Sequence, residues 1–190
     1  MRRDPVHGFM LVEVLVAVLV LALGVLGGAA MQLAALRVRH QSALLSQAVQ
    51  LASSMADRMR ANSGQMRLSD ASNPYMGIDF DTASGAQPVA PVLLCVGAVD
   101  CGGAALARLD LFELEQQLSV NLPGGRLAIC RDGSAWDAGS ASLRWACDGA
   151  ASAPIVIKVG WQRKDSDNGA GGALAPQVPA VALALVGPLP

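Results

Sequence analysis

Apolar residues dominate the first part of the chain. Between Phe9 and Leu36 the only charged residue is Glu13, and most other positions are Leu, Val, Ala or Gly. About 20 consecutive apolar residues are enough for a helix to cross the hydrocarbon core of a bilayer. Residues 9–36 are therefore expected to form a membrane-spanning helix.

The helical pattern continues after Leu36 but becomes one-sided. Apolar residues recur at steps of three and four, as on one face of an amphipathic helix, at Val38, Leu44, Leu45, Ala48, Leu51, Ala52, Met55 and Met59. No proline occurs between Phe9 and Pro74, and Asn62-Ser63-Gly64 supplies a helix stop. We expect one helix from about Phe9 to Ala61, with residues 37–62 as its amphipathic half.

The remaining residues, 63–190, begin with loops and a second helix. Residues 62–105 are rich in Gly, Pro, Ser, Asn and Asp, which indicates loops with room for one short strand at 91–96. The segment 105–122 ends at Pro123-Gly124-Gly125, a clean helix stop. Its near-helical apolar spacing, which predicts a helix, is carried by Leu106, Leu109, Phe112, Leu114 and Leu118.

Three later segments alternate apolar residues with other residues, at 126–131, 155–161 and 179–186. Such alternation predicts strands of an antiparallel sheet with one buried face. Residues 165–177 are expected to form a flexible hairpin loop. The predicted fold class is α+β, with the buried face of the sheet packed against the amphipathic half of the long helix.

Composition and charge narrow the function. The chain is 53% hydrophobic, and its excess apolar residues are concentrated in residues 9–36, while the formal net charge of −1 gives no argument for nucleic-acid binding. Between positions 37 and 68, however, Asp57 is the only acid beside Arg37, Arg39, Arg58, Arg60 and Arg67. A solvated helix face is the favoured interpretation, and contact with lipid head groups or a partner is the alternative.

Four cysteines, all beyond the apolar block, predict two disulfides in a domain outside the cytoplasm. Of the three possible pairings we favour Cys95–Cys101 and Cys130–Cys147, because each closes a local loop. A zinc site is disfavoured because no cysteine pair has the tight spacing of a zinc knuckle. The only histidines are His7 and His40.

No catalytic constellation is present in the sequence. Histidine is too scarce for a nucleophilic triad, and we expect neither an enzyme nor a cofactor. Asp110, Glu113 and Glu115 could suggest an acid pair, but a solvated helix face is the favoured interpretation. Gly24 and Gly28 have the spacing that lets membrane helices approach closely, or that marks a weak point in one helix.

The first eight residues form a short basic leader with Arg2 and Arg3. A cleaved secretory signal is one alternative, since small residues occur at 27–35, but the apolar run is about twice the usual length. Glu13 is the unusual residue, because a carboxylate near a bilayer interior is costly unless it is paired or reaches the interface. A cut between Gly8 and Phe9 would create an amino group four residues away that could neutralise it.

The stretch GFMLVEVLVA at 8–17 resembles the class III prepilin signal of type IV pilins and type II secretion pseudopilins, with Met10 where threonine is usual. A narrower likeness covers residues 21–62, which end in SMADRMRAN, and, more loosely, 106–162 with DLFELEQQLSVNLPGG and IVIKVGWQ. These segments resemble the type IV pilus modification protein (PilV) family of minor pilins.

That resemblance implies a type IV pilin-like fold: leader 1–8, transmembrane and assembly half 9–36, amphipathic half 37–62 and periplasmic domain 63–190. Prepilin peptidase would cleave after Gly8 and methylate Phe9, and Glu13 would pair with a neighbouring subunit's amine. The protein would wait in the inner membrane and then join other minor pilins and the major pilin in a complex that primes assembly, at the pilus tip and cell surface.

Two alternatives stay open at this point. The chain could be a minor pseudopilin of a type II secretion system, although such proteins typically lack the ADRMRAN helix end. It could also be a periplasmic binding domain on a simple membrane anchor. Any receptor contacts are expected in the loops 63–104 and 132–153, because binding residues concentrate in loops on a rigid scaffold.

Overall fold

The computed structural model describes residues 10–92, 95, 101–162 and 178–185, so Phe9 and the loop predicted at 165–177 lie outside the described residues. The chain divides into two compact units, residues 1–43 and 44–190. The second unit thus begins inside the predicted amphipathic half of the long helix.

Helix α1 runs from Leu11 to Ala61. Every side chain from Leu11 to Ala43 is exposed, as expected for a helix that is apolar all round and has no partner element in its own unit. From Leu44 onward the helix buries one stripe at steps of three and four, consisting of Leu44, Ala48, Leu51, Ala52, Met55, Ala56 and Met59. Val38 and Leu45 belong to the predicted stripe but are exposed.

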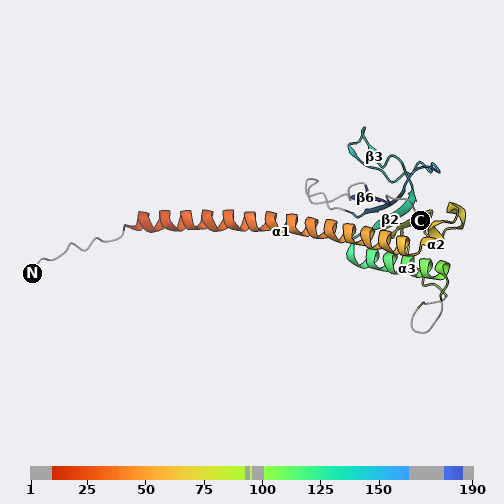
Figure 1. Cartoon of the computed structure of the whole chain (residues 1–190). Helices are drawn as coiled ribbons and strands as arrows, with labels where there is room; N and C mark the ends of the chain where they lie inside the picture. Colours follow the sequence, from red (N-terminus) through yellow and green to blue (C-terminus); the bar gives the residue numbers. More distant parts are fainter. Residues whose placement is uncertain (1–9, 93–94, 96–100, 163–177, 186–190) are drawn as a thin grey trace, which may run out of the picture. The chain divides into compact units, whose positions relative to one another are not determined.

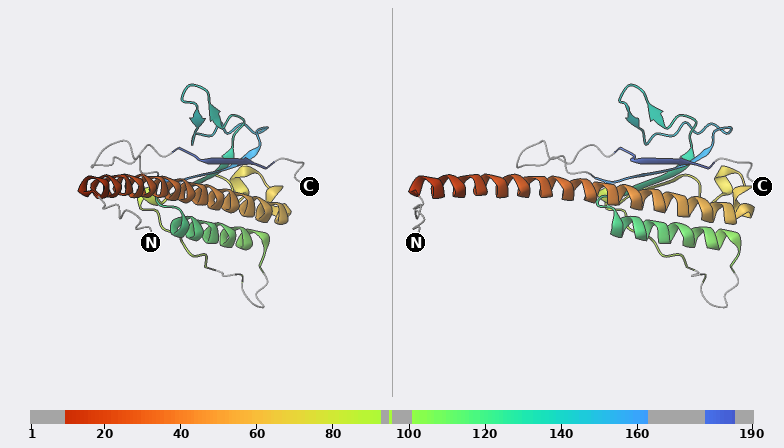
Figure 2. Two further views of the ribbon diagram at one scale, coloured as in Figure 1. Left: turned by 90° about the vertical axis from the view of Figure 1, so that its left-hand side faces the viewer. Right: turned by 60° about the vertical axis from the view of Figure 1, so that its left-hand side comes forward.

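The second unit places helices on one face of a small sheet (Figures 1 and 2). The sheet is antiparallel throughout, in the order β1-β2-β5-β6. Its strands are β1 (Ile78–Asp81), β2 (Arg126–Arg131), β5 (Ile155–Gly160) and β6 (Val181–Ala184). Helix α3 (Gly103–Asn121) lies beside the second half of α1 on the same side of the sheet.

Short elements complete the unit. Helix α2 (Ser63–Met66) and the 3-10 turns η1 (Asp70–Ser72) and η2 (Thr82–Ser84) connect α1 to the sheet. A two-stranded hairpin, β3 (Trp136–Asp137) and β4 (Ser142–Leu143), stands on the side of the sheet away from the helices (Figure 1).

The register of the sheet aligns two apolar rows toward the helices. One row is Ile78, Ile129, Ile157 and Leu183, and the other is Phe80, Leu127, Val159 and Val181. These rows and the buried stripe of α1 belong to one hydrophobic cluster. Because successive strand residues alternate between faces, the same register places Lys158 and its cross-strand partners Ala128 and Ala182 on the opposite, outer face.

The predicted α+β architecture of a long N-terminal helix on an antiparallel sheet is therefore present. The strands expected at 126–131, 155–161 and 179–186 form β2, β5 and β6, and the helix expected at 105–122 forms α3. Helix α1 ends at Ala61, immediately before the predicted stop, although α2 follows after one residue.

The sequence left room for a short strand at 91–96. Its residues 93, 94 and 96 lie outside the described part, and the described residues 91, 92 and 95 belong to no strand. The strand in this region is β1, whose Ile-Asp-Phe-Asp alternation pairs with β2. In α3 the buried side chains include Ala107 and Leu111, whereas Leu106 is 40% exposed and Phe112 is half-buried.

Candidate functional site

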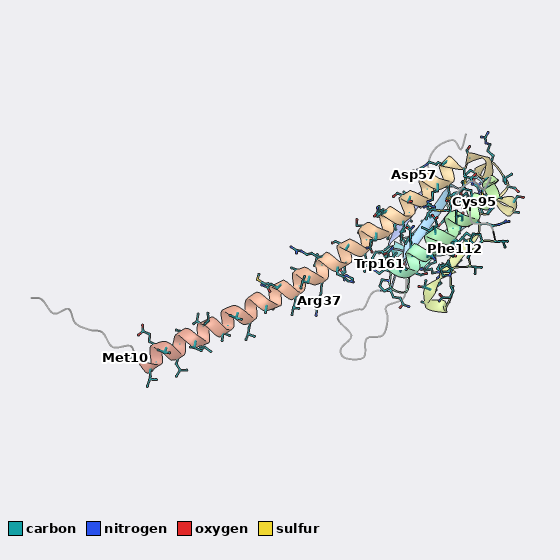
Figure 3. All side chains as sticks on the ribbon, turned by 90° about the horizontal axis from the view of Figure 1, so that it is seen from below. Met10, Arg37, Asp57, Cys95, Phe112 and Trp161 are labelled. Atoms are coloured by element: carbon teal, nitrogen blue, oxygen red, sulfur yellow. A yellow bond between two sulfur atoms is a disulfide. The ribbon has the colours of Figure 1, made fainter. Side chains whose placement is uncertain are left out.

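The first half of α1 has a surface that could act outside the chain. It is the one helix in the described residues long and apolar enough to cross a membrane, by length and composition alone. Figure 3 shows its side chains projecting on all sides between the labelled Met10 and Arg37. Exposed leucines and valines along it include Leu15, Leu19 and Leu23, at 59–70%.

Glu13 lies in the first turn of this helix, and its backbone N–H donates to the Met10 carbonyl at 3.0 Å. An acid in the first turn is favoured by the helix dipole. Within the described residues no side-chain partner of Glu13 is present. The predicted cleavage residues Gly8 and Phe9 lie outside the described residues.

The glycines of the apolar half have no packing role within their own unit. A Cβ atom added at Gly24 or Gly28 would meet nothing within 4 Å. Each glycine nevertheless costs helix stability relative to alanine, by about 1 kcal/mol. A benefit that offsets this cost has to come from outside the described chain or from a change in the helix itself.

A polar cluster joins the end of α1 to α3 in the second unit. Arg58 Nη1 donates to Asp110 Oδ1 at 2.9 Å and to Glu113 Oε2 at 2.6 Å. The hydrogen bond to Glu113, followed by that to Asp110, raises the pKa of the Arg58 guanidinium despite its partial burial. Arg58 and Asp110 are therefore not the solvated helix faces that the charge pattern favoured: Asp110 is 5% exposed.

The same cluster holds the connection that follows α1. The Tyr75 hydroxyl donates to Asp110 Oδ2 at 2.6 Å, and burial together with this bond raises the pKa of Tyr75. Asn62 Nδ2 donates to the Tyr75 hydroxyl at 3.1 Å and to the Gly103 carbonyl at 2.8 Å. A side chain at Gly103 would collide with Asn62, since its Cβ would lie 2.7 Å from Oδ1.

This cluster gives the sequence motifs a physical meaning. Arg58 and Asn62 belong to the segment SMADRMRAN, and Asp110 opens DLFELEQQLSVNLPGG. The two segments that carry the sequence resemblance meet in the structure through charge-assisted hydrogen bonds from Arg58 to Asp110 and Glu113. Their shared role in this chain is to fix α3 against α1.

A loop of residues 132–149, named here the covering loop, covers the outer face of the sheet. It contains the β3–β4 hairpin and is tied to β2 by the disulfide Cys130–Cys147. The second disulfide joins Cys95 to Cys101 ahead of α3. These are the two pairs that local loop closure favours.

Lys158 anchors the covering loop from the middle of β5. Its side chain is completely buried, and Nζ donates to the Asp132 carboxylate. Burial alone would raise the pKa of Asp132, but the hydrogen bonds from Lys158 and from the Ser134 N–H lower it below the ordinary value. Nζ also donates, at 2.9, 3.3 and 2.9 Å, to the carbonyl oxygens of Arg144, Trp145 and Ala146.

Trp145 closes the covering loop onto the sheet. The Arg126 guanidinium lies 4.6 Å from the centre of the Trp145 ring, in cation–π geometry. Arg126 is itself held by two hydrogen bonds to Asp79, at 2.9 and 2.8 Å. Gly160 lies beneath the indole, and a Cβ there would lie 2.9 Å from the ring and 2.7 Å from the Val178 carbonyl, so this approach requires glycine.

An apolar groove of about 720 Å³ lies between α3 and residues 87–92. Phe80, Val89 and Phe112 contribute apolar walls, and Arg108 and Glu115 are its charged members. Burial raises the pKa of Glu115, which therefore differs from the solvated acid that the sequence indicated. The groove includes part of the loop segment 63–104, where we expected any receptor contacts.

Within the described ranges no group of three or more His, Cys, Asp or Glu side chains could hold a metal ion. No protein-family model matches the chain, and neither a curated protein nor a solved structure matches it.

The structure thus separates the predicted site residues. Glu13 lies on the exposed half of α1, while the four cysteines lie in the second unit and pair within it. Sequence reasoning missed Lys158, Asp132 and Tyr75. A lysine between Ile157 and Val159 in a strand pattern was the one visible signal, because a charge there demands either solvent or a partner.

Proposed function

We propose that this chain is a minor subunit of a type IV pilus, held in the inner membrane before it joins a complex that primes pilus assembly. The observation that carries the proposal is the contrast within α1. Its first half exposes an apolar surface on every side, and its second half forms the core of a folded domain.

An exposed surface of that kind requires an outside partner. Soluble monomers rarely expose contiguous apolar patches larger than a few hundred Å². Lipid supplies such a partner for an isolated subunit, and the same helices of neighbouring subunits supply it in a filament. A pilin needs both environments in turn, which accounts for a helix that is apolar all round instead of on one face.

The form of the anchor also favours a pilin over a binding domain on a simple tether. A tether ends where its domain begins, whereas the hydrogen bonding of α1 is continuous from Leu11 to Ala61 and its last turns are core residues. The two disulfides suit a domain in the oxidising periplasm. A pseudopilin of a type II secretion system shares these features, and the likeness of the ADRMRAN helix end favours the pilus.

In this proposal prepilin peptidase cuts between Gly8 and Phe9 and methylates Phe9. The new amine and the Glu13 carboxylate, four residues apart, then neutralise one another within a subunit or between neighbours. The chain acts as a substrate of the peptidase and as a structural partner of other minor pilins and the major pilin. It performs no catalysis of its own.

Mass spectrometry of the mature N-terminus tests the proposal directly. We expect a chain that begins at methylated Phe9. An intact Met1, or cleavage near residues 30–35, would contradict it. Gly8→Leu is the informative variant because it changes only the residue before the cut, and it should leave the leader attached.

Glu13→Ala tests the assembly step separately from processing. We expect normal cleavage and membrane insertion but loss of the chain from the minor-pilin complex and from sheared pili. Val12→Ala, which keeps the acid and trims an adjacent apolar side chain, serves as the matched control. Normal incorporation of the Glu13→Ala chain would rule out the pairing role.

A further inference from the structure

We propose that Arg37 and Arg39 bind the phosphate groups of anionic lipids and thereby set the depth of α1 in the membrane. This inference rests on the proposed function, because it concerns the stage at which the subunit waits in the bilayer. It adds a partner, anionic phospholipid, and a role for two arginines that neither fold nor assembly has used.

The apolar half of α1 is too long to set its own depth. Residues 14–36, the uncharged run between Glu13 and Arg37, rise about 35 Å at 1.5 Å per residue, whereas the hydrocarbon core is about 30 Å thick. A helix with such an excess can tilt or slide along its axis without moving charged groups into lipid. Charged residues at the ends of the apolar run must therefore define its position.

The two ends carry charges at a suitable separation. Glu13 and Arg37 are 24 residues apart, about 36 Å along a helix, so both can reach the polar boundaries of a bilayer. Arg37 and Arg39 differ by about 200° around the helix axis. They consequently face opposite sides of the helix, and His40 adds a further polar group to this collar.

Nothing in the described chain competes for these guanidinium groups. Arg37 and Arg39 are exposed, and neither has a hydrogen bond or ion pair to a described residue. The sequence contains no acid between Glu13 and Asp57, and Asp57 itself pairs with Arg60 at 2.9 Å. The arginines at the other end of this helix, by contrast, all have protein partners or lie in the folded unit.

The chemistry of the collar fits phosphate. Guanidinium groups donate in a planar fork that matches phosphate oxygens, and each basic residue at an anionic membrane surface favours binding by about fivefold. The basic end also lies on the side to which the domain is translocated, where basic residues are normally sparse. Lipid binding gives this unusual position a physical benefit.

The test uses the full chain reconstituted in vesicles of phosphatidylcholine and phosphatidylglycerol. Spin-labelled lipids of each kind measure which lipid occupies the shell around the protein. We expect a severalfold preference for phosphatidylglycerol that falls close to one in R37Q/R39Q and survives in R37K/R39K. R60Q/R67Q is the matched control, because it removes the same charge from exposed arginines of the second unit and should leave the preference unchanged.

Depth is measured on the same samples with a nitroxide at Ala34→Cys, the only free thiol if both disulfides are formed. In R37Q/R39Q we expect the label to change depth by up to about 5 Å, the excess of the uncharged run over the hydrocarbon core. A second label at Leu21→Cys should remain in the hydrocarbon in every variant.

Each outcome has a separate meaning. An unchanged lipid preference or an unchanged Ala34 depth in R37Q/R39Q would overturn the lipid-binding role. If R37Q/R39Q kept the lipid preference and the Ala34 depth of the unaltered chain but failed to enter pili, the arginines would instead pair with acids of another subunit. That result would also overturn the lipid-binding role. A Leu21 label in water would overturn the membrane anchor itself and with it the proposed function, whereas the other two outcomes leave that function intact.

Discussion

The two halves of helix α1 obey different rules although they share one backbone. Between Leu11 and Ala43 every side chain is exposed and the described residues of that unit offer no packing partner. Between Leu44 and Ala61 seven residues are buried in the core of the domain. Helical hydrogen bonding is common to both halves, so what differs is where the apolar side chains find their contacts.

The two halves therefore depend on different contacts. The second half is explained within the chain, because its stripe, the two apolar rows of the sheet and α3 bury one another. The first half is explained only by lipid or neighbouring subunits. Substitutions in the two halves should therefore affect separate measurements. All three tryptophans lie in the second unit, so their fluorescence reports on that unit alone.

The largest expected effect comes from Lys158→Met in the folded unit. This change leaves Asp132 buried without its cation, and breaking a buried pair in this way costs about 3–5 kcal/mol. Urea unfolding followed by tryptophan fluorescence should show the loss. Replacing both residues, K158M/D132L, should recover much of the free energy of unfolding, and Arg37→Met in the exposed half should not change it. A stable K158M variant would mean that the pair does not hold the covering loop.

A matched pair of truncations tests the comparison most directly. Met55→Ala removes a buried side chain from the second half and should lower the free energy of unfolding of the domain by about 2–5 kcal/mol. Leu23→Ala removes a similar volume from the first half, where the side chain is 61% exposed, and should leave that free energy unchanged. If the two substitutions lowered the free energy of unfolding of the domain equally, the first half of α1 would have to contribute to the domain core.

The parts of the fold that could be predicted from the sequence are those with local periodicity. The stripe from Leu44 to Met59 follows helical spacing, and β2 and β5 alternate because one face meets the helices. β1 is harder to find because it has only four residues within a segment rich in turn formers, although its Ile-Asp-Phe-Asp alternation is a usable signal. Apolar propensity alone points to 91–96, where described residues 91, 92 and 95 belong to no strand.

The buried polar residues could not be predicted, because their burial depends on distant partners. Asp110 has the residue type of a solvated position, yet it lies on the buried face of α3, where Arg58 and Tyr75 close over it from elsewhere in the chain. Lys158 lies on what would be the solvated face of an antiparallel sheet, and only the position of the covering loop buries it. Periodicity reports which face is apolar and carries no information on what covers the other face.

Removing the disulfides should have an intermediate effect on the stability of the folded domain. Cys130 and Cys147 are 17 residues apart and Cys95 and Cys101 are 6 apart. Loop-closure entropy therefore predicts losses of about 3 kcal/mol for C130S/C147S and about 2 kcal/mol for C95S/C101S. Both losses should appear in the fluorescence-detected unfolding of the domain, while insertion of the apolar half into vesicles should be unaffected. The reverse order of the two losses would show that the covering loop gains little from its cross-link.

The smallest expected effect is the pH dependence of the domain. The pKa of Asp132 is lowered in the folded state, so its contribution to stability is present above the ordinary carboxyl pKa of 3.8 and is lost as pH falls through the lowered value. Glu115 has the opposite sign: burial raises its pKa, so its contribution is present below its ordinary value and is lost as pH rises through the raised one.

Two variants separate these signs. K158M/D132L should lose less of its free energy of unfolding below pH 4 than the unaltered chain, because it no longer takes up a proton at position 132 on unfolding. Glu115→Gln should stabilise the domain slightly at neutral pH and have no effect in acid, because a neutral side chain at the groove avoids the cost of partly burying a carboxylate. A Glu115→Gln variant that is less stable at neutral pH would show that this carboxylate gains an interaction in the groove that outweighs its burial.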